Sequence, residues 1–464
     1  MNSEILQNAT SLSFDEWMLV LTLVGLFGLE FAHARASGSW LQYFRPTLVV
    51  AAVLVYYCVL APIRSIQLGD WLERGQDLRG AFVWGWWGAI AFYASVLVGF
   101  HQLRTPAFRN RFVGLSNPER MAGLGRNLCR LALVLYGLVA GPTVFAQLNP
   151  FNAKQAIGTA GEGFVLTIGA LGNYFIYGVN LLIPGVLLLY VAWLQNRRNL
   201  GETLVWLLIS FGLFTSLGFR WRLVMIAVPL VLLWSMVRGR RPNFLALASL
   251  GAALIVVVSG AIGESRTYGF GISTSALEDE SVAGLFDKGI IEGRTVFLTT
   301  SGLIERIDQP DEFVGAAPLI SVLTIPIPRQ LLPDKDTIGY LKRSLLRLYL
   351  DPAFAAGAAT LNYGEYYLMA GWFSLVAMGV AFGWGIRCLW NWFLLRSGEP
   401  LAQVTYILSA CFLYVAISRG YMAQVSYLAA FTLGPLYWLY GRLSLPLARF
   451  DAASRARLGE STAA

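Results

Sequence analysis

The sequence predicts an all-α protein, a polytopic bundle of about eleven membrane-spanning helices with one large polar loop. Three observations predict this class. Hydrophobic residues make up 56% of the chain and charged residues only 13%, which is about half the charged share of a soluble domain. The apolar residues are gathered in repeated runs of roughly 20, the length at which a helix crosses a bilayer. Such runs must be helical, because the hydrocarbon core offers no water to satisfy backbone N–H and C=O groups.

Eleven runs are interpreted as spans: Phe14–Phe31, Thr47–Ile63, Ala81–Leu103, Leu128–Leu148, Phe164–Leu194, Thr203–Leu217, Leu223–Val237, Phe244–Ile262, Leu361–Trp392, Leu401–Ile417 and Tyr421–Tyr440. The run Phe164–Leu194 is too long for one straight helix and contains Gly178 and Pro184. We expect it to be tilted, broken or partly re-entrant.

The distribution of Lys and Arg among the loops predicts the orientation. Alternate loops and the C-terminal tail are basic, through Arg35, Arg45, Arg104, Arg109, Arg111, Arg120, Arg126, Arg197, Arg198, Arg238, Arg240, Arg241, Arg387, Arg396, Arg442, Arg449, Arg455 and Arg457. Cytoplasmic loops carry this excess of positive charge. The alternation is consistent only with eleven spans, the N-terminus outside and the C-terminus inside. It also places the large loop outside.

The large loop, residues 263–360, differs in composition from the regions on either side, 1–262 and 361–464, which form the membrane helices and the tail. It has 13 acidic and 9 basic residues, whereas the whole chain has a net charge of +8. The basic pI therefore reflects membrane topology and does not favour nucleic-acid binding. Within the loop, Gly284–Ile307 has the pattern of an amphipathic helix, which lies either at the membrane interface or on the loop's own core. The prolines of Ile325–Lys335 predict an extended, rigid segment.

Six cations lie on the predicted outer face, where topology disfavours positive charge. They come from four separate segments and are Arg220, Arg222, Arg266, Arg329, Lys335 and Arg419. A guanidinium presents a planar fork of donors that suits phosphate oxygens. The alternative for each one is snorkelling to lipid headgroups or pairing with an acidic neighbour such as Glu264 or Asp334.

Few other side chains in the sequence suggest chemistry. Glu365 follows Asn362 by three positions, so it is either a capping-box residue or a catalytic or charge-pairing one. His33 and His101 are interpreted as isolated, solvated residues near helix ends. With no other histidine and no zinc-like cysteine spacing, we expect no metal site and no cofactor.

Four pieces of the C-terminal half carry a family resemblance. They are Gly218-Phe-Arg-Trp-Arg222, Ile325-Pro-Ile-Pro-Arg-Gln-Leu-Leu-Pro-Asp-Lys335, Asn362-Tyr-Gly-Glu-Tyr-Tyr-Leu-Met-Ala-Gly371 and Ser418-Arg-Gly420. In these pieces the chain resembles the Wzy-type polymerases of O-antigen and other oligosaccharide repeat units, which are enzymes of the bacterial inner membrane.

The resemblance implies a glycosyltransferase of the C-type superfold, used in lipopolysaccharide and related polysaccharide biosynthesis, that joins undecaprenyl-pyrophosphate-linked repeat units without a metal. Its partners would be that lipid-linked oligosaccharide, membrane lipids and a regulator of chain length. The catalytic residues would be Arg266, Arg329 and Glu365. Pyrophosphate contacts would come from Arg220, Arg222, Lys335 and Arg419.

Two other classes stay open. A flippase for lipid-linked oligosaccharide, or another transporter, is the first, although the sequence shows no internal repeat. An O-antigen ligase is the second, and an outer-side histidine would favour it. A structural scaffold would not need a set of arginines suited to phosphate.

Overall fold

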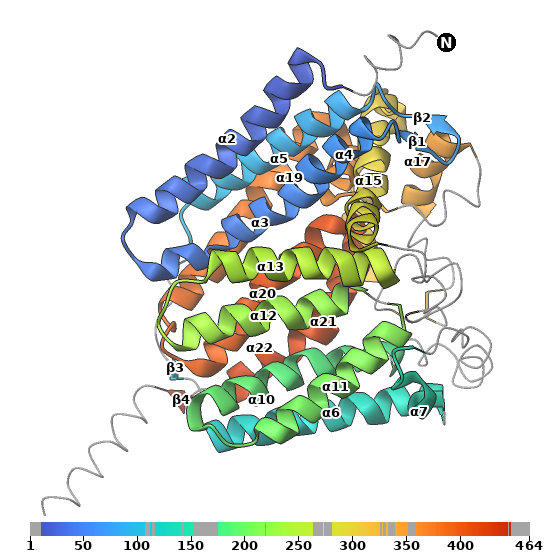
Figure 1. Ribbon diagram of the computed structural model, residues 1–464. Helices are drawn as coiled ribbons and strands as arrows, with labels where there is room; N and C mark the ends of the chain where they lie inside the picture. The colour runs from blue at the N-terminus through green and yellow to red at the C-terminus, as the bar shows by residue number, and fades with distance from the viewer. Residues whose placement is uncertain are drawn as a thin grey trace, which may run out of the picture.

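The computed structural model describes residues 11–106, 112–113, 117–141, 143–151, 175–218, 220–262, 272, 281–324, 327, 331–332, 339–350, 359–443 and 445–446. The described chain is a helical bundle whose strands are confined to two short antiparallel pairs (Figure 1). These pairs join β1 (Leu72–Glu73) to β2 (Gln76–Asp77) and β3 (Phe112–Val113) to β4 (Leu445–Pro446).

Several of the described helical elements continue one another within a single span. In chain order the helical elements are α2 (Phe14–Ala36), η1 (Trp40–Phe44), α3 (Pro46–Leu54), η2 (Val55–Leu60), α4 (Ala61–Gln67), α5 (Phe82–Gln102), α6 (Pro118–Ala140), α7 (Thr143–Gln147), η3 (Gly178–Leu181), α10 (Leu182–Asn196), α11 (Leu200–Ser216), α12 (Arg220–Val237), α13 (Phe244–Leu254), η4 (Ile255–Ala261), α15 (Val282–Arg306), η6 (Pro310–Glu312), α16 (Ala317–Thr324), α17 (Gly339–Tyr349), α19 (Asn362–Leu394), α20 (Pro400–Ser418), α21 (Met422–Thr432) and α22 (Gly434–Leu443).

Nine helices of the described chain are long and apolar enough to cross a membrane, which confirms a multi-pass membrane protein. The predicted count of eleven is not confirmed. The predicted span Thr203–Leu217 corresponds to α11, which has 17 residues. The predicted span Tyr421–Tyr440 is divided into α21 and α22, which are separated at Leu433. The predicted long run from Phe164 is described only from Phe175 onward, where the 3₁₀ segment η3 interrupts the α-helix.

Glycines allow the closest helix packing. A Cβ at Gly99 in α5 would lie 2.1 Å from the Val380 carbonyl oxygen of α19, and a Cβ at Gly383 in α19 would lie 2.1 Å from that of Val96. The α5–α19 pair therefore depends on small residues on both helices, as is typical of membrane helix interfaces.

Helix α15 crosses one end of the bundle, on the right in Figure 1. Its apolar face packs on the membrane helices: Phe297 contacts Phe82 and Trp86 at the start of α5. The loop helix is thus confirmed, and its apolar face covers helix ends of the bundle. We call this the α15 end; α2, α5, α12 and α19 begin there, and α4, η4 and α20 end there.

Ion pairs hold α15 in place. The Arg64 guanidinium donates to Asp287 at 2.7 Å, and Arg294 pairs with Asp70 and with Glu73. Arg64 lies in the last turn of α4 and Arg294 lies in α15, so these pairs join the loop helix to the end of the bundle.

Helix α19 is broken at Gly371, which has a φ of +67° that a glycine tolerates. The break frees carbonyl groups in the preceding turn. The backbone N–H groups of Val314 and Gly315 donate to the carbonyls of Leu368 and Met369, at 2.8 and 3.1 Å. A segment of the large loop therefore satisfies backbone groups that the break exposes.

Candidate functional site

The structure describes four of the seven predicted site residues: Arg220, Arg222, Glu365 and Arg419. Arg266, Arg329 and Lys335 lie outside the described residues. All four belong to the α15 end, because α12 and α19 begin there and α20 ends there.

Arg222 is the most deeply placed of the four. It lies in the first turn of α12 and is 1% exposed. Its guanidinium lies 5.5 Å from the Phe214 ring centroid and 5.4 Å from that of Trp221. Such positions over aromatic faces stabilise a cation. Snorkelling to lipid headgroups is therefore wrong for Arg222, because the side chain is enclosed by protein.

Arg419 lies at the same end of the bundle as Arg222. It follows the last residue of α20 and is partly buried. The two guanidinium groups are close enough to interact electrostatically, and Tyr136 and Tyr177 lie within the same range of Arg222. Arg220 lies at the start of α12, where its Nη1 approaches the Ser259 carbonyl oxygen at 3.5 Å. The structure thus places Arg222 and Arg419 within electrostatic range of each other, with Arg220 two residues away in α12.

The turn that carries Arg419 is held by backbone contacts to the segment before α19. The Gly420 N–H donates to the Thr360 carbonyl at 2.6 Å, and the Thr360 hydroxyl donates to the Gly420 carbonyl at 3.1 Å. The Leu361 N–H in turn donates to Thr300 Oγ1 of α15 at 2.8 Å. The loop helix, the start of α19 and the arginine turn therefore form one hydrogen-bonded unit.

Glu365 is 1% exposed and binds the backbone just after that turn, at the start of α21. Its two carboxyl oxygens accept the Met422 N–H, at 2.9 and 3.1 Å, and Oε1 also accepts the Tyr340 hydroxyl at 2.5 Å. Met422 is the first residue of α21. An acidic group at a helix N-terminus satisfies an orphan N–H and interacts favourably with the helix dipole.

The capping-box interpretation of Glu365 is wrong. The residue that caps α19 is Leu361, with no side-chain hydrogen bond, and Asn362 is already the first helical residue. Glu365 therefore caps α21, 57 positions away in the chain, and not its own helix.

Tyr340, on the loop helix α17, belongs to the site although the sequence did not indicate it. It is 2% exposed, and burial followed by the neighbouring Glu365 raises the pKa of its hydroxyl well above the usual value. The hydroxyl therefore stays protonated and donates to Glu365. Its only sequence signal is an aromatic residue on the apolar face of Gly339–Tyr349.

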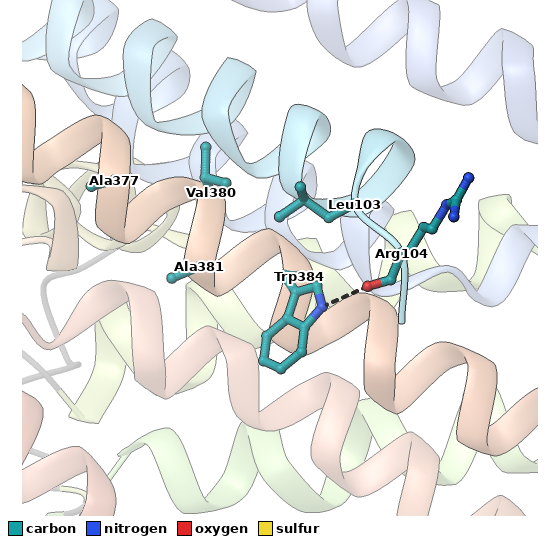
Figure 2. Close-up of a pocket in the computed structure, with 6 residues that line it drawn as sticks. All are labelled: Leu103, Arg104, Ala377, Val380, Ala381 and Trp384. Atoms are coloured by element: carbon teal, nitrogen blue, oxygen red, sulfur yellow. Dashed lines mark hydrogen bonds between the residues drawn. The ribbon is translucent and has the colours of Figure 1, made fainter. Parts of the chain in front are cut away.

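A groove elsewhere in the bundle is not part of this site. Figure 2 shows its lining: Leu103, Arg104, Ala377, Val380, Ala381 and Trp384, around a volume of about 370 Å³. The Trp384 indole N–H donates to the Arg104 carbonyl at 3.1 Å. Because Arg104 follows the last turn of α5, this groove lies toward the end opposite α15.

The prediction that His33 and His101 are isolated is also wrong. Their ring centroids are 4.9 Å apart, and His101 Nε2 lies 2.8 Å from Glu30 Oε2. The signal that was missed is the spacing Glu30-Phe-Ala-His33, which places both side chains on one face of α2.

No family model, curated protein or solved structure matches the chain.

Proposed function

We propose that the chain is a membrane glycosyltransferase that polymerises oligosaccharide repeat units carried on undecaprenyl pyrophosphate. An acceptor hydroxyl of the incoming unit would attack the anomeric carbon of the growing chain. The new glycosidic C–O bond forms, the bond from that carbon to pyrophosphate breaks, and the hydroxyl proton is lost to solvent or a base. The lipid pyrophosphate leaves with the bonding electron pair.

The observation that carries the proposal is that Arg222 and Arg419 both lie at the α15 end, where their guanidinium groups interact electrostatically. Like charges held near each other in a poorly solvated region favour binding of an anion. A pyrophosphate presents several anionic oxygens to such a pair and can accept paired N–H donors from each guanidinium. The leaving group gains negative charge during the reaction, so these cations would also lower the barrier.

Roles for the other residues follow from their positions. Arg220 would extend the cationic surface at the start of α12. Arg266, Arg329 and Lys335 of the large loop are proposed as additional contacts, on the family resemblance and their sequence positions. Glu365 is proposed as a positioning residue, because its carboxyl group holds the N–H of Met422, three residues after Arg419.

The proposal includes the orientation. The α15 end would face the outside of the bacterial inner membrane, where the growing glycan is exposed, and the tail would be cytoplasmic. Of the two alternatives, a ligase is less well supported, because His33 and His101 lie in the last turns of α2 and α5, at the end opposite α15.

Purified variants acting on purified lipid-linked repeat units test the function. Losing one hydrogen bond to a charged group costs on the order of 1.5–3 kcal/mol. If the bond acts in the transition state, Arg222→Lys and Arg419→Lys should each lower the polymerisation rate roughly 10–150-fold.

Arg396→Lys is the matched control. Arg396 is 6% exposed and its guanidinium lies 5.6 Å from the Trp392 ring, but it belongs to the opposite end of α19. Wild-type rates for both site variants would refute the proposed role. Translocation of the lipid-linked unit by proteoliposomes, without polymer formation, would establish the transporter instead.

A further inference from the structure

Three potential metal ligands meet at the end of the bundle opposite α15. Glu30 and His33 lie on α2 and His101 lies in the last turn of α5. One ligand atom from each residue lies within 4.8 Å of the other two. The two imidazole rings are tilted by 33° to each other. Both histidines of the chain are therefore in one cluster with a carboxylate.

The fold produces this cluster through two simple features. Residues three positions apart lie on the same face of a helix, so Glu30 and His33 project together. Helices α2 and α5 both begin at the α15 end and pack side by side, as the contact between the Phe27 and Tyr93 rings shows, with centroids 4.9 Å apart. Their last turns therefore meet, which brings His101 to the pair on α2.

The carboxyl group of Glu30 is oriented by other side chains. It is 3% exposed. The Thr47 hydroxyl donates to Oε1 at 2.6 Å, and Arg45 Nη1 lies 3.5 Å from the same oxygen. Oε2 is left facing His101. Outer hydrogen bonds that fix a ligating carboxylate in this way are typical of metal sites.

Among the described residues, the hydrogen bonds and ion pairs of buried Glu30 come from side chains other than His33. Thr47, Arg45 and His101 supply these hydrogen bonds and the counter-charge. His33 is exposed and stands beside His101, where an imidazole adds a second nitrogen ligand. A metal site explains why His33 stands in the cluster, whereas an ion pair between Glu30 and its other partners does not require it.

We propose that Glu30, His33 and His101 bind a divalent transition-metal ion of the zinc type. Two imidazole nitrogens and one carboxylate oxygen are a common zinc set and leave the fourth position to water. Ligand distances of about 2.0–2.2 Å require the three atoms to draw closer than 4.8 Å. The exposed His33 ring can make that movement. Arg45 is bound to the other carboxylate oxygen, so the ion and the guanidinium would share Glu30 with some electrostatic cost.

The ion would join the last turns of α2 and α5. This site is distinct from the proposed pyrophosphate site, because the two lie at opposite ends of the bundle. Its role would be to fix the packing of α2 against α5, and it does not depend on the proposed transferase activity.

Zinc titration of the full-length protein tests the site. The protein must carry no histidine tag, since its own two histidines are the ligands in question. After treatment with a chelator, detergent-solubilised protein is titrated with Zn²⁺ in a calorimeter. We expect one ion per chain, and we expect zinc to raise the melting temperature, because a ligand of the folded state stabilises it.

His33→Ala is the informative variant, because Glu30 keeps its contacts to Thr47, Arg45 and His101 and the fold is preserved. It should weaken zinc binding at least ~10-fold and abolish the shift in melting temperature. Arg35→Ala, an exposed change in the same turn of α2, should bind zinc as the wild type does. Absence of one-to-one binding in the wild type, or equal binding by His33→Ala, overturns the proposal.

Discussion

Replacing Gly420 by alanine tests the contact that positions Arg419. A Cβ at Gly420 would lie 2.3 Å from Thr360 Oγ1 and 2.5 Å from the Leu361 carbonyl oxygen. The second of these atoms is backbone and cannot rotate away. The segment before α19 and the turn after α20 must therefore separate.

The expected cost follows from what the separation breaks. Gly420 and Thr360 exchange two hydrogen bonds, at 2.6 and 3.1 Å. Each contributes about 0.5–1.5 kcal/mol net, so losing both costs about 1–3 kcal/mol. If the bonds persist, the strain of overpacking lowers the free energy of unfolding by about 1–3 kcal/mol instead. The effect on activity should be larger, because a displacement of about 1 Å in a substrate-binding group can lower a rate roughly 100-fold.

Two measurements on the purified Gly420→Ala variant check this reasoning. Thermal melting should show a modest decrease in stability, and polymerisation of lipid-linked repeat units should fall much further. Gly434→Ala is the control, since a Cβ at Gly434, the first residue of α22, meets no atom within 4 Å. A Gly420→Ala variant that melts and polymerises like the wild type would refute the positioning of Arg419 by this contact.

The remaining predictions concern Glu365, Tyr340 and the orientation. Glu365→Gln should lower the melting temperature, because the carboxylate–helix interaction, about 0.3–2 kcal/mol, is lost; unchanged melting would show that the charge of Glu365 does not stabilise α21. Tyr340→Phe should cost about 0.5–1.5 kcal/mol and loosen α17, as measured by faster proteolysis of the large loop, and no change would show that the hydroxyl does not anchor α17. In a cysteine-free background, an impermeant thiol reagent should label a cysteine at position 311 from outside and not one at position 109; the reverse pattern would invert the proposed topology.

The membrane helices could be predicted from the sequence because their signal is local. A run of apolar residues long enough to cross the bilayer is a property of one segment, so the predicted span Phe14–Phe31 lies within α2. The amphipathic helix of the loop was predicted for the same reason. The predicted count of eleven spans is not confirmed: at α11 the hydrophobic run is present, but the helix has 17 residues.

The contacts of the site could not be predicted, because they join segments that are distant in sequence. Glu365 was assigned to its own helix, yet its partners are Met422 and Tyr340. Nothing within a few residues of Glu365 signals either partner. The two histidines were interpreted as isolated residues near helix ends, although the parallel packing of α2 and α5 makes their last turns neighbours.

Arg222 lies deeper in the bundle than the sequence predicted. Its burial strengthens the argument for an anionic substrate. Arg222 was grouped with the cations of the predicted outer face and its span was expected to begin at Leu223, but α12 begins at Arg220, so Arg222 is already inside the bundle. Removing a guanidinium from water has a large desolvation cost. The rings of Phe214 and Trp221 offset part of that cost. Arg419, which is within electrostatic range, adds repulsion.

Pyrophosphate is expected to raise the melting temperature of the wild-type protein. Its negative charge, bound near Arg222 and Arg419, would attract both cations and so offset their mutual repulsion. The same ligand should have no effect on an Arg222→Met variant, which keeps an apolar side chain of suitable length but loses the charge. Equal stabilisation of both proteins would place the anion elsewhere.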